Sequence, residues 1–303
     1  MRRLAKSVVL IYVLVVAMMG FFQRKLLYHP RTAPAMQVAK FQDVVSHFPA
    51  AKDVQLTCDD GICIGGWLLR KEETSTADAQ RPLVMYFHGN AGNRASRMGW
   101  YRIFSECGAD VLAIDYHGYG DSQGQMSETG LEHSAKAAWK HATSALGYSP
   151  GKVTVAGTSL GGAAAVFAAS EACQAGQQPA ALFVVATFSS MVDVASSLYP
   201  WLPVKAVLAD RYPSDDRIKS VTCPVVVLHG DEDRLVYQKF GRKLFDAAPG
   251  CSTCNTDKRW ISLAGIGHND ILSSAGHVVR DEFSRLMMRP LTNANADPKE
   301  SVR

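Results

Sequence analysis

The pattern of apolar and polar positions predicts a domain built from alternating strands and helices. Short runs rich in β-branched residues and bounded by turn residues predict buried strands, and longer amphipathic stretches predict helices. The expected strands are 82–87, 109–115, 152–156, 182–186, 224–228 and 260–263, and the expected helices are about 94–107, 128–146, a run directly after Ser159, and 273–288. This alternation indicates a mostly parallel sheet with helices on both faces.

The first 25 residues are predicted to be a membrane anchor. Three basic residues precede an uncharged run over 8–22, and Arg24 and Lys25 close it. As a helix this run spans ~22 Å, and counting from Leu4 with Lys6 snorkelling gives nearly the ~30 Å of a hydrocarbon core. A cleaved signal peptide would share the basic start and the apolar run, but no A-x-A site follows. We therefore expect an uncleaved, single-pass anchor in the lipid bilayer, of type II orientation, although the flanking charges differ little between the two sides.

The remaining chain divides into a connector (26–53), one domain (54–289) and a polar tail (290–303) that is expected to be disordered. Residues 54–58 and 62–69 alternate and predict a hairpin. The apolar connection 190–222, broken by two prolines, predicts a small cap. Its apolar side chains either pack on the core or line an acyl pocket, and the expected substrate contacts are Met191, Leu198 and Trp201.

Charge and cysteine content narrow the possible partners. A net charge of +4, dispersed over 303 residues, gives no basic patch, so no nucleic-acid partner is expected. If Asp60-Gly61 is a two-residue turn, Cys58 and Cys63 face each other within disulfide range. Cys251 and Cys254 form a second pair, and one C-x-x-C without a further ligand pair is poor evidence for zinc. The sequence therefore predicts no metal and no cofactor.

A nucleophile motif follows the strand at 152–156. Gly157-Thr158-Ser159-Leu160-Gly161 fits G-x-S-x-G between a β-branched run and an Ala-rich run, which is the strand–turn–helix context this motif requires. The turn would expose the Ser159 hydroxyl at the end of the sheet, where parallel sheets bind ligands. The pattern predicts an α/β-hydrolase fold with Ser159 as nucleophile.

The serine needs a base, and the base needs an orienting carboxylate. The order Ser…Asp…His is met by Ser159, an acid near 231–233 and His268, each in a loop after a strand. Asp231 and Asp233 are both eligible, and the spacing from His229 favours Asp233. The backbone N–H groups of Leu160 and Asn90 are the expected oxyanion donors, with Ala91 as the alternative to Asn90. His88 and His229, each before a glycine at a strand end, are expected to be structural.

These residues together resemble the membrane-anchored α/β-hydrolases exemplified by α/β-hydrolase domain-containing protein 13, the bud-emergence-related hydrolases. The resemblance extends from the anchor to the final helix. The stretches that carry it are 23–30, Asp60-Gly61 with Gly66-Trp67, 88–93, 115–122 with 127–131, 157–162 and 267–270. His117 departs from the family pattern, which often has arginine there. The resemblance implies a type II anchor and hydrolysis of acyl esters or thioesters, including palmitoyl groups on proteins.

Two other functions stay open at this stage. Serine-peptidase activity is compatible with the same three residues, although oligopeptidases of this fold carry a large gating domain for which the chain has no room. A membrane-tethered scaffold without activity would have no need of Ser159, Asp233 and His268 together. The sequence therefore favours a hydrolase of lipid-like acyl esters, thioesters or acylated proteins.

Overall fold

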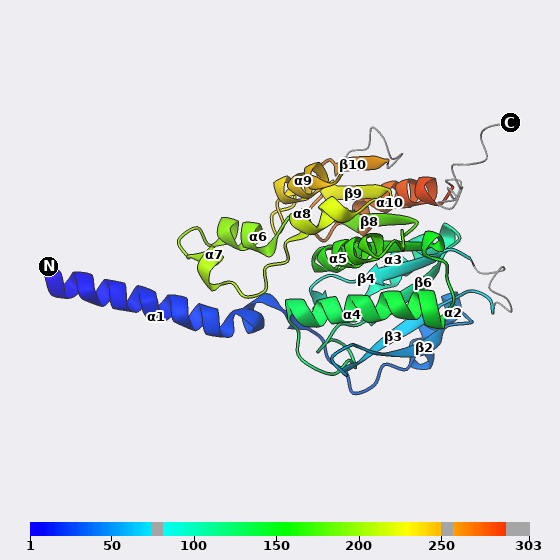
Figure 1. Ribbon diagram of the computed structural model, residues 1–303, viewed down its shortest axis with the longest axis horizontal. Coiled ribbons are helices and arrows are strands. Elements are labelled where there is room, and N and C mark those ends of the chain that lie inside the picture. The colour runs from blue at the N-terminus through cyan, green and yellow to red at the C-terminus, as the bar shows by residue number, and fades with distance from the viewer. Residues whose placement is uncertain (74–80, 250–256, 289–303) are drawn as a thin grey trace.

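A computed structural model describes residues 1–73, 81–249 and 257–288, and its centre is a twisted, mostly parallel sheet (Figure 1). The eight main strands lie in the order β10-β9-β8-β7-β4-β6-β3-β2, with β2 and β3 antiparallel to their neighbours. The strands are β1 His29–Pro30, β2 Lys52–Thr57, β3 Cys63–Leu69, β4 Leu83–Phe87, β5 Ala91–Gly92, β6 Asp110–Ile114, β7 Val153–Thr158, β8 Ala181–Val185, β9 Val225–Gly230 and β10 Lys258–Leu263. The predicted α/β-hydrolase fold is confirmed.

Helices cover both faces of the sheet. Those on one face are α4 (Glu128–Lys140), α5 (Leu160–Gln174), α8 (Ser214–Arg217) and α9 (Gln238–Ala247), and those on the other are α2 (Gln42–His47), α3 (Met98–Glu106) and α10 (Ile271–Met287). The shorter turns are 3-10 segments at Val38–Lys40, Arg94–Arg97, Pro150–Lys152 and Ile218–Ser220, and a π-helical turn at His141–Ala145. Glycine and alanine fill the buried face of α5, which lets this helix lie close against β7 and β4.

The predicted hairpin forms, but its turn differs from the expectation. Cys58 and Ile62 exchange a backbone hydrogen bond, Gly61 N–H donates to the carbonyl of Cys58, and Gly61 has φ +80°. The turn is therefore a three-residue loop with glycine in the left-handed region, not a two-residue Asp60-Gly61 turn. Register pairs Thr57 with Cys63, so Cys58 and Cys63 point to opposite faces and both are free thiols. The expected Cys58–Cys63 disulfide was wrong, and Cys251 and Cys254 lie outside the described residues.

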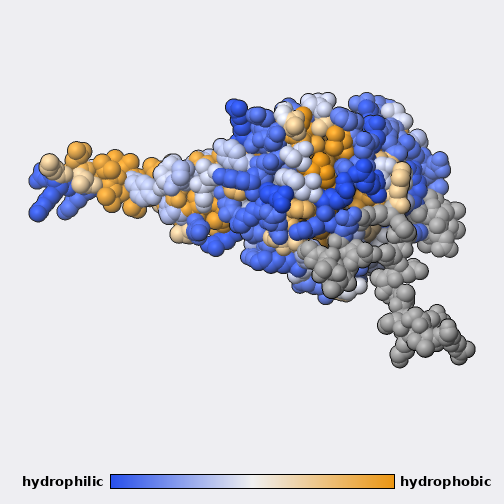
Figure 2. Space-filling model, turned by 90° about the horizontal axis from the view of Figure 1, so that it is seen from above, coloured by the Kyte–Doolittle hydropathy of each residue, from blue (hydrophilic) through white to orange (hydrophobic). Residues whose placement is uncertain are grey.

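The N-terminal segment is a long helix, α1 (Arg2–Leu27), that projects from the domain (Figures 1 and 2). Its mean hydropathy is 2.3, and among the described residues it alone is long and apolar enough to cross a membrane. In the connector after it, β1 pairs in parallel with β5. The predicted tail, residues 290–303, lies outside the described residues.

The connection 190–222 forms short helices, as predicted. They are α6 (Met191–Leu198), α7 (Val204–Val207), α8 and the 3-10 turn after α8, with a proline-containing turn between α6 and α7. The side chain of Ser190 accepts a hydrogen bond from the N–H of Asp193 and so caps α6. In Figure 1, α6 and α7 lie on the same side of the domain as α1.

Candidate active site

Ser159 occupies a strained turn between β7 and α5. Its φ of 52° and ψ of −120° are rare for a residue with a side chain. The flanking glycines make the turn possible: a Cβ on Gly157 would lie 2.1 Å from the Gly161 carbonyl oxygen, and one on Gly161 would lie 2.1 Å from that of Phe87. Thr187 Oγ1 donates to the Ser159 carbonyl (2.9 Å), and Ser159 N–H donates to that of Val185 (2.9 Å). The hydroxyl is thereby fixed at the carboxyl end of the sheet.

The structure brings the other two predicted residues to this hydroxyl. His268 Nε2 lies 3.1 Å from Ser159 Oγ, and His268 Nδ1 lies 2.6 Å from Asp233 Oδ2. An ionised carboxylate can only accept, so Nδ1 carries a proton and Nε2 directs its lone pair at the serine. Asp231 instead accepts from the N–H of Gly265 and lies away from His268. The choice of Asp233 over Asp231 therefore agrees with the geometry.

Asp233 is buried and held by four donors. Its Oδ1 accepts from the N–H groups of Leu235 (2.9 Å) and Val236 (2.8 Å), and its Oδ2 lies 3.2 Å from His229 Nε2 as well as beside His268. Burial alone would raise the pKa of Asp233, but hydrogen bonds from His229 and His268 lower it well below its ordinary value. The carboxylate therefore stays ionised next to His268.

The expected oxyanion donors border Ser159. Leu160 is the first residue of α5, so its N–H is one of the four that have no carbonyl partner within the helix. The loop after β4 passes close by, since a Cβ on Gly89 would lie 3.5 Å from the Ser159 Cβ. Tyr119 Oη lies 2.7 Å from the carbonyl oxygen of Asn90 and 2.9 Å from its Oδ1. These contacts fix the orientation of the loop that carries Asn90.

The connector that follows α1 also contacts this loop. Asn90 Nδ2 donates to the carbonyl of Leu27 (2.6 Å), the last residue of α1, and the N–H of His29 donates to Asn90 Oδ1 (3.3 Å). Together with the pairing of β1 and β5, these bonds couple the end of α1 to the candidate oxyanion loop.

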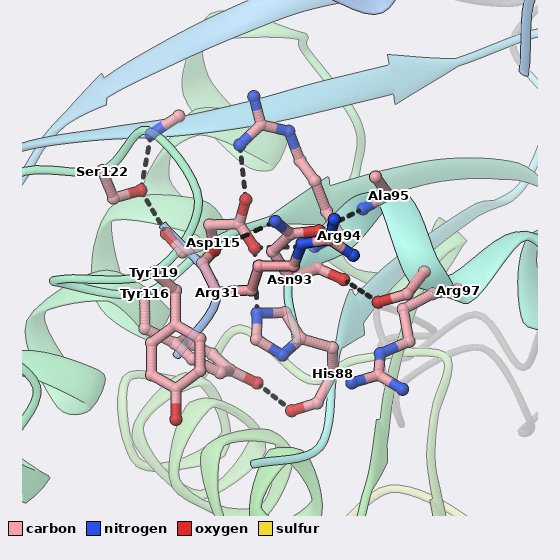
Figure 3. A network of polar contacts seen from close by, with 12 residues as sticks. Arg31, His88, Asn93, Arg94, Ala95, Arg97, Asp115, Tyr116, Tyr119 and Ser122 are labelled. Carbon is pink, nitrogen blue, oxygen red and sulfur yellow. Dashed lines mark hydrogen bonds and ion pairs between the residues drawn. The ribbon is translucent and has the colours of Figure 1, made fainter. Parts of the chain in front are cut away.

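A buried charge network supports the same loop from beneath (Figure 3). Arg94 Nη1 donates to Asp115 Oδ2 (2.5 Å) and Asp121 Oδ1 (2.6 Å), and Arg94 N–H donates to Asp115 Oδ1 (2.7 Å). His88 Nε2 lies 3.0 Å from Asp115 Oδ1, and Tyr116 Oη donates to the His88 carbonyl (2.6 Å). The two terminal nitrogens of the guanidinium bond these carboxylates and the Met36 carbonyl, which offsets the loss of water, whereas the buried Nε has no partner. His88 is a structural residue in this network, as is His229 beside Asp233.

The three predicted substrate contacts lie in different environments. Met191 is buried in the core that includes α5, whereas Leu198 (42% exposed) and Trp201 (51% exposed) lie on the surface of the cap. The structure also shows a groove of about 540 Å³ between α1 and the cap. It is lined by Tyr12, Val13, Val16, Ala17, Gly20, Gln23, Pro203 and Val207. The sequence did not indicate this groove, because it joins segments nearly 200 residues apart.

Several supporting residues escaped the sequence analysis. Arg94, Thr187 and Gly241 carried no motif of their own. A Cβ on Gly241 would lie 2.3 Å from His229 Nδ1, so this glycine makes room for the imidazole that contacts Asp233. Tyr119 lies in a stretch that contributed only to the family resemblance. The cluster of glycine, aspartate and tyrosine at 115–122, directly after a predicted strand, is the one sequence feature that could have indicated these supporting residues.

Comparisons with known proteins agree with this arrangement. Residues 82–220 match the family model described as alpha/beta hydrolase fold. An uncharacterized protein of Mycobacterium tuberculosis, Rv2307c, is 34% identical over 265 residues, which cover 88% of this chain and 87% of the relative. The lysophosphatidylserine lipase ABHD12 of Danio rerio is 30% identical over 228 residues, which cover 66% of this chain and 59% of the relative.

A solved structure extends the likeness of fold. The esterase Pf2001 of Pyrococcus furiosus superposes with a TM-score of 0.63 at 16% identity, over 87% of this chain and 99% of that chain. Sequence, topology and the strained serine turn all lead to the same assignment: the chain belongs to the α/β-hydrolase family, and its relatives include a lysophosphatidylserine lipase.

Proposed function

We propose that the chain is a serine hydrolase that cleaves carboxylic esters or thioesters of lipid-like acyl groups, including acyl groups on proteins. The observation that carries the proposal is the continuous contact from Asp233 through His268 to Ser159, at 2.6 and 3.1 Å. Relatives support this class of reaction, since one is a lysophosphatidylserine lipase and a structure of similar fold is an esterase.

The reaction follows from the positions of these atoms. Ser159 Oγ attacks the acyl carbonyl while His268 Nε2 takes the hydroxyl proton, and the same proton then goes to the departing alcohol or thiol. The carbon–oxygen or carbon–sulfur bond breaks and leaves an acyl-serine. Water then attacks this ester and gives a proton to His268, which passes it to Ser159 Oγ as the acyl–oxygen bond breaks and the carboxylic acid leaves. Asp233 holds His268 in the required tautomer and stabilises its charged form.

The developing oxyanion is stabilised by the N–H groups of Leu160 and Asn90. Loss of one such donor costs about 3 kcal/mol of transition-state stabilisation in a comparable site. Tyr119 orients the Asn90 peptide and so contributes indirectly, without contact with the substrate.

The preference for lipid-like acyl groups is supported by the position of α1. Tyr12 Oη donates to the carbonyl of Trp201 in the cap (2.9 Å). Tyr12 lies twelve positions before Arg24, which is at the domain end of the helix. Twelve helical residues span ~18 Å, which is more than half of the ~30 Å hydrocarbon core. If α1 is a type II anchor in the bilayer, the tip of the cap reaches the apolar layer, and the groove between α1 and α7 receives an acyl chain.

Labelling with a fluorophosphonate probe tests the proposal on the full-length protein in membranes. The parent is expected to be labelled, and Ser159→Ala and His268→Ala to lose the label. The exposed residues Ser274 and His277 offer matched controls, and Ser274→Ala and His277→Ala should keep it. An unlabelled but folded parent would contradict the proposal. Cleavage of short peptide amides in preference to acyl esters would favour a peptidase instead.

A further inference from the structure

A cluster of metal-ligating side chains lies at the turn between β2 and β3, outside the candidate active site. Cys58 and Asp60 belong to the turn, and His117 follows β6. One ligand atom of each of these three residues lies within 4.8 Å of the other two. His133 of α4 is a fourth potential ligand, because its Nδ1 lies 2.9 Å from Asp60 Oδ2. None of these residues takes part in the proposed hydrolysis.

The hydrogen bonds around His117 direct its Nε2 at Asp60. The Ser134 hydroxyl donates its single proton to the carbonyl of Gly130 (2.7 Å), so Ser134 Oγ accepts from His117 Nδ1 (2.8 Å). His117 Nε2 then faces Asp60 Oδ2 at 3.0 Å. A cation bound between this nitrogen and the carboxylate would be coordinated by a lone pair from each of them.

Local charge and burial favour a cation here. Cys58 is buried and the side chain of His117 is 4% exposed, whereas Asp60 and His133 reach solvent and leave a path for entry. A cation between these groups would displace the thiol proton to solvent and offset the repulsion between thiolate and carboxylate.

We propose that Cys58, Asp60 and His117 bind a divalent cation of the zinc type, with His133 as fourth ligand. Sulfur, nitrogen and oxygen donors in this combination suit Zn²⁺, and one thiolate and one carboxylate balance its charge of +2. Around a tetrahedral zinc with ligands at ~2.0–2.3 Å, the Cys58 sulfur would move closer to the other ligands, and the Asp60 contacts with His117 (3.0 Å) and His133 (2.9 Å) would lengthen. The Ser134 contact to Nδ1 is the outer hydrogen bond that orients metal-bound histidines.

The site would link three segments that support the active site. It joins the β2–β3 turn to α4 and to the loop after β6, and that loop carries Tyr119, whose hydroxyl bonds Asn90. Metal binding would therefore stiffen the candidate oxyanion loop without contact with the substrate. The inference stands independently of the proposed hydrolysis, since it rests on a separate set of residues.

Cobalt substitution tests the site. Full-length protein in detergent, with Cys251→Ser and Cys254→Ser to remove the other cysteine pair, is stripped with a chelator and titrated with Co²⁺. We expect one Co²⁺ per chain and a thiolate-to-cobalt absorption band. Cys58→Ser should abolish the band, and Cys63→Ser, the neighbouring thiol on the opposite face, should keep it. Ser134→Ala should weaken affinity by about 10–100-fold.

A substitution at the exposed residue Asp60 separates loss of metal binding from loss of folding. Asp60→Asn keeps an oxygen that can accept the turn hydrogen bond from Ile62 N–H, removes the ligand charge, and should weaken Co²⁺ binding at least tenfold while the circular dichroism spectrum stays that of the parent. Three results would each overturn the inference: no Co²⁺ bound by the folded parent, unchanged binding in Asp60→Asn, or a band that disappears with Cys63 instead of Cys58. The first would mean that His117 and Asp60 form a proton-mediated ion pair only.

Discussion

At the scale of single residues, the site depends on glycines that admit the Ser159 turn. Gly161→Ala should destroy activity, because its Cβ would overlap the backbone carbonyl of Phe87 and displace the serine. Helix propensity alone would favour alanine over glycine by about 1 kcal/mol. A loss of activity in Gly161→Ala would therefore result from the steric overlap and not from a weaker helix. We expect kcat for a short ester to fall at least ~100-fold, since displacement by about 1 Å can have this effect. Steady-state kinetics with a soluble ester measure it.

Gly151 provides the matched control for this substitution. It lies in a 3-10 turn with open space around the position of a Cβ. Gly151→Ala should therefore leave both kcat and the thermal midpoint close to those of the parent. Equal kinetics in both variants would show that the turn tolerates a side chain next to Ser159.

Asp233 makes stability depend on pH in a defined direction. Its pKa is lowered in the folded protein by hydrogen bonds from His229 and His268, which outweigh the opposite effect of burial. The unfolded carboxyl titrates near ~3.9, so the carboxylate stabilises the fold above that pH and the contribution is lost as pH falls toward the lower folded pKa. Asp233→Asn removes the contribution, so the difference in unfolding free energy between parent and variant should shrink below pH ~4. Urea unfolding at pH 3 to 7 measures it.

The same substitution should remove activity at every pH. An asparagine at this position stabilises the wrong tautomer of His268, and the expected loss in kcat is about 10⁴-fold. A constant stability difference across pH 3 to 7 would contradict the assigned ionisation. Retained activity would contradict the role of Asp233.

Sequence reasoning was effective for residues whose chemistry depends on local pattern. Ser159 lies in a motif that contains its own steric requirements, and Asp233 and His268 follow strands that must end at the same edge. Arg94 and Thr187 act through contacts with residues 21 or more positions away, and no local spacing encodes such contacts. These residues become recognisable once the order of the strands is known.

At the scale of elements, the connector is part of the active-site architecture. Removal of residues 1–22 leaves Leu27, His29 and the β1–β5 pair in place, whereas removal of 1–31 deletes the partners of Asn90. We expect the shorter truncation to keep kcat for a soluble ester within about twofold and the longer one to lose at least ~10-fold, because the oxyanion loop is less well positioned. The test measures kcat of both purified truncations in the same detergent. Circular dichroism sets equal concentrations of folded protein for the comparison. Equal kcat would show that the loop holds its shape unaided.

The β2–β3 turn shows where prediction of elements fails. Alternation located both strands correctly, but turn type decides register, and a shift of one residue moves a side chain to the opposite face. Asp59-Asp60-Gly61 allows either a two-residue or a three-residue loop, and the structure has the latter. This single difference separates Cys58 from Cys63 and directs Cys58 toward Asp60 and His117.

At the scale of the whole molecule, α1 and the cap together form a surface that neither forms alone. Arg24 pairs with Asp210 (2.9 Å), and Tyr28 Oη donates to the same carboxylate (2.9 Å), so the end of α1 is anchored to the cap segment between α7 and α8. The sequence predicted the anchor and the cap separately. Their contact could not be predicted, because it depends on the direction in which α1 leaves the domain.

The groove between α1 and α7 should make activity depend on acyl length. If the chain lies there, each methylene buried adds ~0.8 kcal/mol, so kcat/KM should rise on the order of fourfold per methylene until the groove is filled. Val207→Asn keeps the approximate size of the side chain but places an amide in the groove, so the rise should flatten for long esters while short esters change little. A series of nitrophenyl esters on the membrane-bound protein measures how kcat/KM changes with acyl length.

Ser197→Asn, on α6 and outside the groove, is the matched control and should keep the parental dependence of kcat/KM on acyl length. A parental slope in Val207→Asn would place the acyl chain elsewhere, and the exposed cap residues Leu198 and Trp201 would then be the next positions to substitute.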